Sequence, residues 1–167
     1  MNRLKPCLGG ILLAFFFFTA GSCRDESPND PADRADRTEL LRLVNEARAA
    51  GCNCGTTWFP PAAALTWNDT LETAAQNHCS DMARKNFFSH TGSDGATVSD
   101  RVTRLGYRYR MVGENIAKGQ LSEQQVVEGW LASPGHCANL MNGQFREMGV
   151  ARKEDYWTQV LGRRLDD

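Results

Sequence analysis

The feature that most constrains the fold of this chain is the order of its segments, with helical patterns first and two strand-like runs last. The runs cover Met148 to Arg152 and Tyr156 to Leu161, and Lys153-Glu154-Asp155 between them predicts a turn. Helices followed by a strand hairpin favour helices packed against an antiparallel sheet. We therefore predict an α+β fold with a small antiparallel sheet.

Helix signals are frequent before this hairpin. Apolar residues recur at helical spacing after Thr38, and Gly51 ends that segment. Pro60-Pro61 excludes helix from the loop over residues 52–67, and Tyr107 to Met111 predicts a short strand. The other helix starts are signalled by Asp69 with Glu72, Thr97 with Asp100, Ser122 with Gln125, and Ser133-Pro134.

Residues 1–22 have the layout of a signal peptide of the lipoprotein type. Arg3 and Lys5 precede an apolar run that is too short for an ordinary membrane-spanning helix, and small residues follow the run. Cys23 comes directly after these small residues, as in a bacterial lipobox, where the cysteine is lipidated. A lipid on Cys23 would tether the chain to a membrane without spanning it. Ordinary cleavage nearby, which leaves a soluble secreted protein, is the alternative.

The rest of the chain divides into a tether, one domain and a short tail. Residues 23–37 are rich in Asp, Arg, Pro and Ser and have no large apolar side chain, so they predict a flexible tether. Residues 38–163 are long enough for one domain, and residues 164–167 form a C-terminal tail. We expect the domain to be exported and anchored in the cell envelope through Cys23.

The charge of the chain bears on its partners. The formal net charge is −1, and loss of a leader that contains Arg3 and Lys5 makes the mature chain more acidic. The chain therefore lacks the long-range basic field that attracts nucleic acid. Four arginines lie close together in sequence and are expected on a solvated face: Arg101, Arg104, Arg108 and Arg110.

Six cysteines are present, of which Cys7 leaves with the signal peptide and Cys23 is the proposed lipid site. The other four are Cys52, Cys54, Cys79 and Cys137. They predict two disulfides, because an exported chain enters an oxidising compartment. The first two are too close in sequence to pair comfortably, so each should pair with one of the other two. A four-cysteine zinc site is the competing interpretation, although C-x-C spacing suits it poorly.

Three polar residues are predicted to meet in a cleft, namely His90, Glu114 and His136. His90 leaves a helix just before a polar loop, and Glu114 lies between small and apolar residues in Gly113-Glu114-Asn115-Ile116-Ala117. His136 falls at the third position of the last predicted helix, where the positive helix end favours a neutral imidazole. His78 lies on an apolar helix stripe and is predicted to be structural.

Several short segments carry a family resemblance through their order and spacing over roughly Leu40 to Gly162. They are Leu43-Val44-Asn45 with Arg48, Leu65-Thr66-Trp67-Asn68, Asp81-Met82-Ala83, Phe88-Ser89-His90, Gly113-Glu114-Asn115-Ile116-Ala117, Trp130-Leu131-Ala132-Ser133-Pro134-Gly135-His136 and Tyr156-Trp157-Thr158-Gln159-Val160. Together they resemble the CAP superfamily (cysteine-rich secretory proteins, antigen 5, pathogenesis-related 1) in its bacterial SCP-domain branch. The resemblance implies the CAP/SCP fold, an α-β-α sandwich with a small antiparallel sheet between helices.

In eukaryotic members of that superfamily, a central cleft holds two histidines and two glutamates, and some members bind zinc there. By this resemblance, His90 matches the first histidine and Glu114 matches one glutamate. Tyr156 stands in the place of the second histidine, and Ser133 stands near that of the second glutamate. His136 is typical of the bacterial branch and supplies another imidazole. The resemblance therefore implies a cleft formed by His90, Glu114, His136 and Tyr156.

Three function hypotheses follow. The first is an extracytoplasmic binding module that engages an envelope, lipid or peptide ligand through the cleft, because no nucleophile motif is evident. The second is a zinc-dependent hydrolase, in which His90, His136 and Glu114 hold zinc or another divalent cation and Glu114 and His136 are the candidate catalytic residues. The third is a structural envelope protein whose cleft residues only pack.

Overall fold

The computed structural model describes residues 35–166 of the 167-residue chain. The predicted signal peptide, the lipid site at Cys23 and the tether up to residue 34 lie outside the described residues. Within the described part, no helix is both long enough and apolar enough to cross a membrane. This part contains the predicted domain with a few residues at each end.

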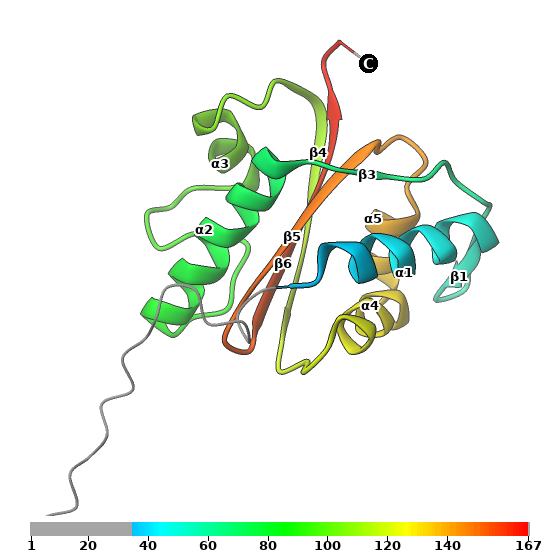
Figure 1. The fold of residues 1–167 in the computed structure, drawn as a ribbon, viewed down its shortest axis with the longest axis horizontal. Coiled ribbons are helices and arrows are strands. Elements are labelled where there is room, and N and C mark those ends of the chain that lie inside the picture. Colours follow the sequence, from blue (N-terminus) through cyan, green and yellow to red (C-terminus); the bar gives the residue numbers. More distant parts are fainter. Residues whose placement is uncertain (1–34, 167) are drawn as a thin grey trace, which may run out of the picture.

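The elements follow the chain in the order that Figure 1 shows. The helices are α1 (Arg37–Ala50), α2 (Asp69–Lys85), α3 (Val98–Arg104), α4 (Glu123–Ala132) and α5 (Pro134–Met141). The strands are β1 (Cys52–Cys54), β2 (Thr57–Phe59), β3 (Thr66–Trp67), β4 (Tyr109–Lys118), β5 (Glu147–Lys153) and β6 (Tyr156–Arg164). The predicted C-terminal hairpin consists of β5 and β6, which pair antiparallel across a turn at Glu154, where φ is 54°.

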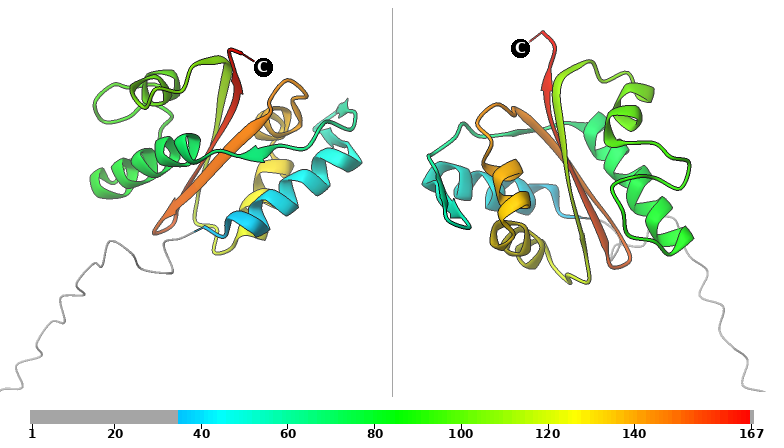
Figure 2. Two further views of the ribbon diagram at one scale, coloured as in Figure 1. Left: turned by 45° about the horizontal axis from the view of Figure 1, so that its top comes forward. Right: turned by 180° about the vertical axis from the view of Figure 1, so that it is seen from behind.

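A four-stranded sheet in the order β3-β5-β6-β4 forms the middle layer. Helices α2 and α3 lie on one side of this sheet, and α1, α4 and α5 lie on the other (Figures 1 and 2). The predicted α-β-α sandwich is therefore confirmed. One detail differs from the prediction, because the two-residue β3 runs parallel to β5 and makes the sheet mixed. Strand β4 is an edge strand, so one of its sides is free for other segments.

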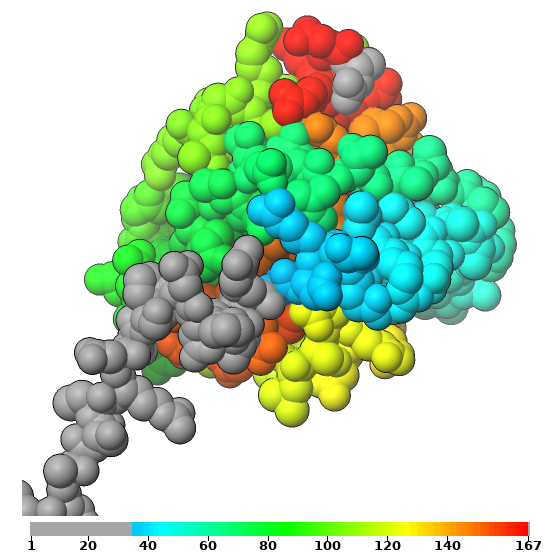
Figure 3. Space-filling view, viewed as in Figure 1, coloured from blue at the N-terminus to red at the C-terminus, as the bar shows by residue number. Residues whose placement is uncertain are grey.

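Each face of the sheet has its own apolar core. On the side of α1, α4 and α5, the core includes Val44 and the large side chains of Trp130 and Trp157. On the side of α2 and α3, it includes Leu71 and Val160. Figure 3 shows α1 beside the yellow surface of α4, with which it is in contact. Full burial of one such side chain contributes about 1.5–3 kcal/mol, so these two cores hold the helices to the sheet.

Polar side chains set where the helices begin. The sequence predicts Thr38 as the first cap, but α1 begins at Arg37 because the Asp36 side chain accepts the first backbone N–H groups. Asp36 and Arg37 therefore belong to the domain and not to the tether. At α3, the predicted pair of Thr97 and Asp100 forms a full capping box. Local sequence signals thus locate the helices to within about a residue.

Strands are predicted less well than helices. The predicted strand over residues 107–111 is only the start of β4, and Glu114 lies in the middle of that strand, opposite Val160 of β6. The predicted loop over residues 52–67 contains three short strands, of which β1 and β2 pair with each other and β3 joins the main sheet. Strands of two or three residues are too short to show an alternating pattern.

The prediction of two disulfides is wrong. Among residues 35–166, one disulfide joins Cys54 to Cys137, and Cys52 and Cys79 are free thiols. Cys79 lies on α2 and Cys137 on α5, and these helices cover opposite faces of the sheet. Cys79 instead donates to the Thr158 hydroxyl at 3.1 Å, and burial raises the pKa of its thiol to about 12. The layered fold therefore separates the cysteines that the second disulfide would need.

Candidate functional site

Strand β4 sends successive side chains to opposite faces of the sheet. Glu114 faces α2 and α3, whereas the amide group of Asn115 donates to the carbonyl of His136 on α5. Asn139 of α5 completes this link by donating to the Glu114 carbonyl at 3.3 Å and to Asn115 Oδ1 at 3.0 Å. The candidate site therefore extends over both sides of an edge strand.

Glu114 is the centre of the site, and only 2% of its side chain is exposed. His90 Nδ1 lies 2.8 Å from Oε1, and Arg101 Nη2 donates to Oε2 at 2.6 Å. His78 Nε2 lies 4.0 Å from Oε1. We call these four residues the Glu114 cluster. A buried carboxylate is stable only when a cation and hydrogen-bond donors compensate its charge, and this cluster provides both.

Arg101 is the member of the cluster that sequence reasoning missed. The prediction of a solvated face is wrong for it, since only 8% of its side chain is exposed. Besides Glu114, its guanidinium contacts the carbonyls of Ala96 and His90. The signal that could have found Arg101 is the carboxylate itself, because a buried Glu needs a nearby cation. The other three arginines are exposed, as predicted: Arg104, Arg108 and Arg110.

His90 is held by Glu114 but remains open to solvent, with 57% of its side chain exposed. Since an ionised carboxylate only accepts hydrogen bonds, Nδ1 carries the proton, and the neutral ring presents Nε2 as an acceptor. The hydrogen bond with Glu114 raises the pKa of His90, and burial partly opposes this shift. His90 is therefore an oriented, accessible imidazole.

His78 has the structural role that the sequence predicts. It is buried, and its Nε2 donates to the carbonyl of Ser89 at 2.8 Å. Burial lowers the pKa of His78, so the neutral ring is favoured. Because Ser89 directly precedes His90, this bond from α2 also helps to place the His90 backbone.

His136 lies near the cluster without joining it. It occupies the third position of α5, as predicted, on the other side of β4 from Glu114. Burial lowers the pKa of His136, and the charge of His90 lowers it further. The lowered pKa agrees in direction with the predicted neutral state of His136. Its causes are burial and the charge of His90, whereas the prediction is based on the positive helix end. The two imidazoles are thus close enough to interact electrostatically.

Tyr156 lies apart from these residues. It is buried opposite Lys118 in the register of β4 and β6, four residues further along β4 than Glu114. Its hydroxyl accepts from Lys118 Nζ at 2.6 Å and donates to Asn86 Oδ1 at 3.4 Å. The structure therefore brings His90 to Glu114 and His136 near them, and it places Tyr156 at the far end of α2.

These residues do not fit the zinc centre that the family resemblance implies. His90 Nδ1 and Arg101 engage the two oxygens of Glu114, and the Arg101 cation would repel a metal ion there. Among residues 35–166, one group of three candidate ligands has its ligand atoms within 4.8 Å of one another, and it lies elsewhere: Cys52, Cys54 and Cys137. The predicted metal set of His90, Glu114 and His136 is therefore not assembled.

A cavity of about 290 Å³, lined mainly by polar and charged residues, borders the Glu114 cluster between α2 and α3. His78 and Arg101 line its inner side, and His78 Nδ1 and Arg101 Nε are buried without a hydrogen-bond partner among the described residues. The neutral His78 ring accepts at Nδ1, and Arg101 donates at Nε. The charged residues around the rest of the cavity are Asp81, Arg84, Asp94 and Arg104.

Known proteins resemble this chain in sequence. The model of the cysteine-rich secretory protein (CAP) family matches residues 41–161. The Bacillus subtilis protein YkwD is 37% identical over 97 residues, which are 57% of this chain and 38% of that protein. The Bacillus subtilis membrane protein YlbC is 34% identical over 102 residues, which are 61% of this chain and 30% of that protein. Each match thus spans less than half the length of the relative.

Solved structures of other proteins resemble this chain in fold. An extracellular protein with an SCP domain from Bacillus anthracis superposes with a TM-score of 0.68 at 30% identity, over 76% of this chain and 40% of that chain. An outer surface protein from Borrelia burgdorferi superposes with a TM-score of 0.62 at 23% identity, over 76% of this chain and 88% of that chain. The family model spans nearly the whole described domain, and this chain therefore belongs to the cysteine-rich secretory protein (CAP) family, as a bacterial member.

Proposed function

We propose that this chain is an exported binding module that holds a polar peptide at the Glu114 cluster, through His90 and the adjoining cavity. The state of Glu114 is the main support for this proposal. Its carboxylate is buried and bound to His90 and Arg101, so it orients His90 and is not free to act as a base. A fixed imidazole with an accessible Nε2 suits recognition of a hydrogen-bonding ligand.

The surroundings of the imidazoles favour binding over hydrolysis. Within residues 35–166, no serine, threonine or cysteine side chain is hydrogen-bonded to His90 or His136. A hydrolase without such a nucleophile would depend on a metal-bound water, and the Arg101 cation at Glu114 opposes a metal there. The zinc-hydrolase hypothesis has no support from this geometry.

The charge of the cavity favours a peptide over a lipid. Arg84 and Asp81 line it together with Arg104 and Asp94, which pair with each other at 2.6 Å. Charges of both signs at one cavity suit a ligand with both a carboxylate and an amino group. A lipid tail needs apolar surface. A more apolar surface lies elsewhere, in an open groove of about 640 Å³ along α1 that includes Leu41, Ala49 and Trp67.

Binding of a polar peptide can be tested with short peptides that carry both charges, measured by fluorescence anisotropy. His90→Ala should weaken binding about tenfold or more, because it removes a hydrogen bond to a charged or polar group. Leu41→Ser, on the α1 groove, is the matched control and should leave the affinity unchanged. Equal affinity of His90→Ala and wild type for the peptides would contradict the proposal. It would also be contradicted if the protein bound phospholipid vesicles but no peptide, and if Leu41→Ser abolished that vesicle binding.

Export and membrane attachment are part of the same proposal. Residues 1–22 have the pattern of a signal peptide, and Cys23 has the position of a lipidated cysteine. The relatives include an extracellular protein and a membrane protein. We expect Cys23→Ser to abolish incorporation of a labelled fatty acid and to release the protein from the membrane fraction, whereas Cys7→Ser should do neither. Retention of label in Cys23→Ser would refute the anchor.

A further inference from the structure

Three sulfur atoms lie together where β1 meets α5, and the Glu114 cluster does not use them. Cys54 and Cys137 form the disulfide, and the Sγ of the free Cys52 lies 3.6 Å from that of Cys137. All three sulfur atoms are within 4.8 Å of one another. Since the sulfur of Cys137 carries no proton, the thiol of Cys52 is the donor in their contact.

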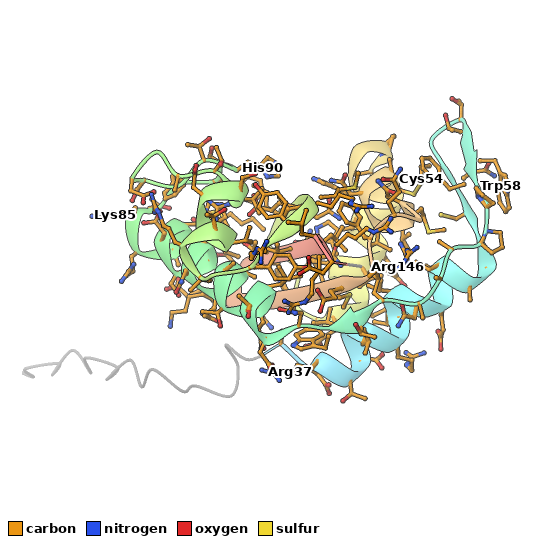
Figure 4. All side chains as sticks on the ribbon, turned by 90° about the horizontal axis from the view of Figure 1, so that it is seen from above. Arg37, Cys54, Trp58, Lys85, His90 and Arg146 are labelled. Carbon is orange, nitrogen blue, oxygen red and sulfur yellow. A yellow bond between two sulfur atoms is a disulfide. The ribbon has the colours of Figure 1, made fainter. Side chains whose placement is uncertain are left out.

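The local structure explains why two cysteine side chains of β1 face Cys137. Cys52 and Cys54 are two residues apart on a strand, so their side chains share a face, and the residue between them is exposed. Gly55, with φ of 63°, turns the chain into β2 and lies against Pro134 at the start of α5. This contact holds the hairpin of β1 and β2 beside Cys137. Figure 4 shows Cys54 and Trp58 on that hairpin, far from Lys85 at the end of α2.

We propose that Cys52, Cys54 and Cys137 form a thiol–disulfide exchange site. At this site the disulfide bond of Cys137 is transferred from one cysteine of β1 to the other. The thiolate of Cys52 attacks the Sγ of Cys137, a Cys52–Cys137 bond forms, and the Cys54–Cys137 bond breaks. Cys54 leaves as a thiolate and takes up, through solvent, the proton that Cys52 released. The numbers of thiols and disulfides do not change, so the step needs no oxidant or reductant.

The contact between the sulfur atoms of Cys52 and Cys137 favours the exchange, and the burial of Cys52 slows it. Cys52 Sγ already touches Cys137 Sγ, so the attack requires alignment with the bond that breaks rather than approach from a distance. Burial raises the pKa of the Cys52 thiol, so exchange is slower than with a fully exposed thiol. Cys79 cannot take part, because it lies on the opposite face of the sheet, where its thiol donates a hydrogen bond to Thr158.

The exchange changes the residue of β1 to which α5 is crosslinked. Two residues of a strand span about 7 Å, so the point of attachment along the backbone of β1 changes by about that length.

The alternative use of the same sulfur atoms is a site for a soft metal cation, which three thiolates would bind once the disulfide was reduced. The metal site differs from the exchange site in a measurable way, since a bound cation protects all three sulfur atoms from alkylation.

Disulfide mapping of the mature, unreduced protein tests the exchange. The protein is incubated at pH 8 without added thiol, quenched with acid, alkylated and digested, and the crosslinked peptides are identified by mass spectrometry. We expect both Cys54–Cys137 and Cys52–Cys137 crosslinks in the wild type. The second crosslink should be lost in Cys52→Ser and should be the only one in Cys54→Ser. Cys79→Ser is the matched control and should give the wild-type pattern.

Wild-type protein that contains only the Cys54–Cys137 crosslink would overturn the inference, whatever the variants show, so the test does not depend on their folding. Crosslinks that involve Cys79 would also overturn it, because they would indicate random scrambling. A stoichiometric metal ion that protects Cys52, Cys54 and Cys137 from alkylation would replace the exchange site with a metal site.

Discussion

At the scale of single residues, the site depends on how one buried carboxylate is compensated. Glu114 has a cation at one oxygen, Arg101, and an imidazole donor at the other, His90. Each partner is itself held by other bonds, since Arg101 also binds the carbonyl of His90. The orientation of His90 is therefore set by residues that have little exposure, and changes at these buried residues should affect stability and the titration of the imidazoles.

Arg101→Met should destabilise the domain by about 3–5 kcal/mol, because it leaves the Glu114 charge buried without its cation. The measurement is the free energy of unfolding in urea. Arg110→Met, at an exposed arginine, is the matched control and should change the free energy by less than about 0.5 kcal/mol. Equal values for the two variants would show that Arg101 does not stabilise Glu114.

The His90 pair also predicts a dependence on pH. The hydrogen bond with Glu114 raises the pKa of His90 above its ordinary value in the folded state. The pair therefore contributes stability that is fully present below the unfolded pKa, about 6.5, and is lost as the pH rises through the folded pKa. Replacing the acceptor by Glu114→Gln should lower the pKa of His90, which NMR titration of the imidazole resonances measures.

A second titration serves as the control for this assignment. The charge of His90 lowers the pKa of His136, so His90→Gln, at an exposed position, should raise the pKa of His136. Arg110→Met should shift neither histidine. A His136 pKa that stays the same in His90→Gln would mean that the two imidazoles do not interact.

The residues of the site differ in how well the sequence predicts them. His90 and Glu114 are recognisable because they lie in short motifs with family spacing. Arg101 is not recognisable, because nothing in its neighbourhood shows that its side chain turns inward to a strand beyond the end of α3. Tyr156 is misplaced because the resemblance gives its position in the chain, whereas the pairing of β4 with β6 sets its distance from Glu114.

At the scale of elements, α2 carries the greatest share of the site, since it provides His78 and leads into His90. Its first turn is fixed by Asn68, whose side chain accepts the backbone N–H groups of Thr70 and Leu71. The same side chain donates to Glu147 of β5 at 2.8 Å. The cap of α2 therefore also joins the helix to the sheet.

Asn68→Ala should cost about 2 kcal/mol, at the upper end for an N-cap, because the variant also loses the bond to Glu147. Ser122→Ala removes the exposed cap of α4 and should cost about 0.5–1 kcal/mol. Thermal and urea unfolding of both variants give the comparison. A larger loss in Ser122→Ala than in Asn68→Ala would contradict this account of α2.

Elements with local signals are predicted, and elements defined by distant partners are not. The starts of α3 and α4 are visible because a cap and its partner lie three residues apart. Strand β3 is invisible because two residues become a strand only through pairing with Glu147 and Met148, far along the chain. Its parallel direction follows from the fold and from no local pattern.

At the scale of the whole molecule, the sandwich depends on close contact between α2 and the sheet. Gly149 of β5 lies directly under the backbone of Leu71 and Glu72, and an added Cβ would overlap those backbone atoms. Only glycine allows this approach. The cysteine pairing has the same origin, because the two layers of helices decide which cysteines can meet, and sequence spacing alone does not show on which layer a helix lies.

Gly149→Ala should lower the free energy of unfolding by about 3 kcal/mol or more, since backbone atoms cannot move aside as a side chain can. Gly129→Ala is the matched control on exposed α4, where the nearest atom to an added Cβ is 3.7 Å away. The control should stabilise the helix by about 0.5–1 kcal/mol. Urea unfolding distinguishes the two signs, and a tolerated Gly149→Ala would show that α2 can retreat from the sheet.

The disulfide between Cys54 and Cys137 closes a covalent ring, because the two cysteines are 83 positions apart in sequence. Helices α2 and α3, strand β4 and every residue of the Glu114 cluster lie within this ring. A protease that cuts the ring once opens it without releasing either piece, and only a second cut frees a peptide. A domain proposed to work outside the cell would thereby keep its site in one molecule after a single scission.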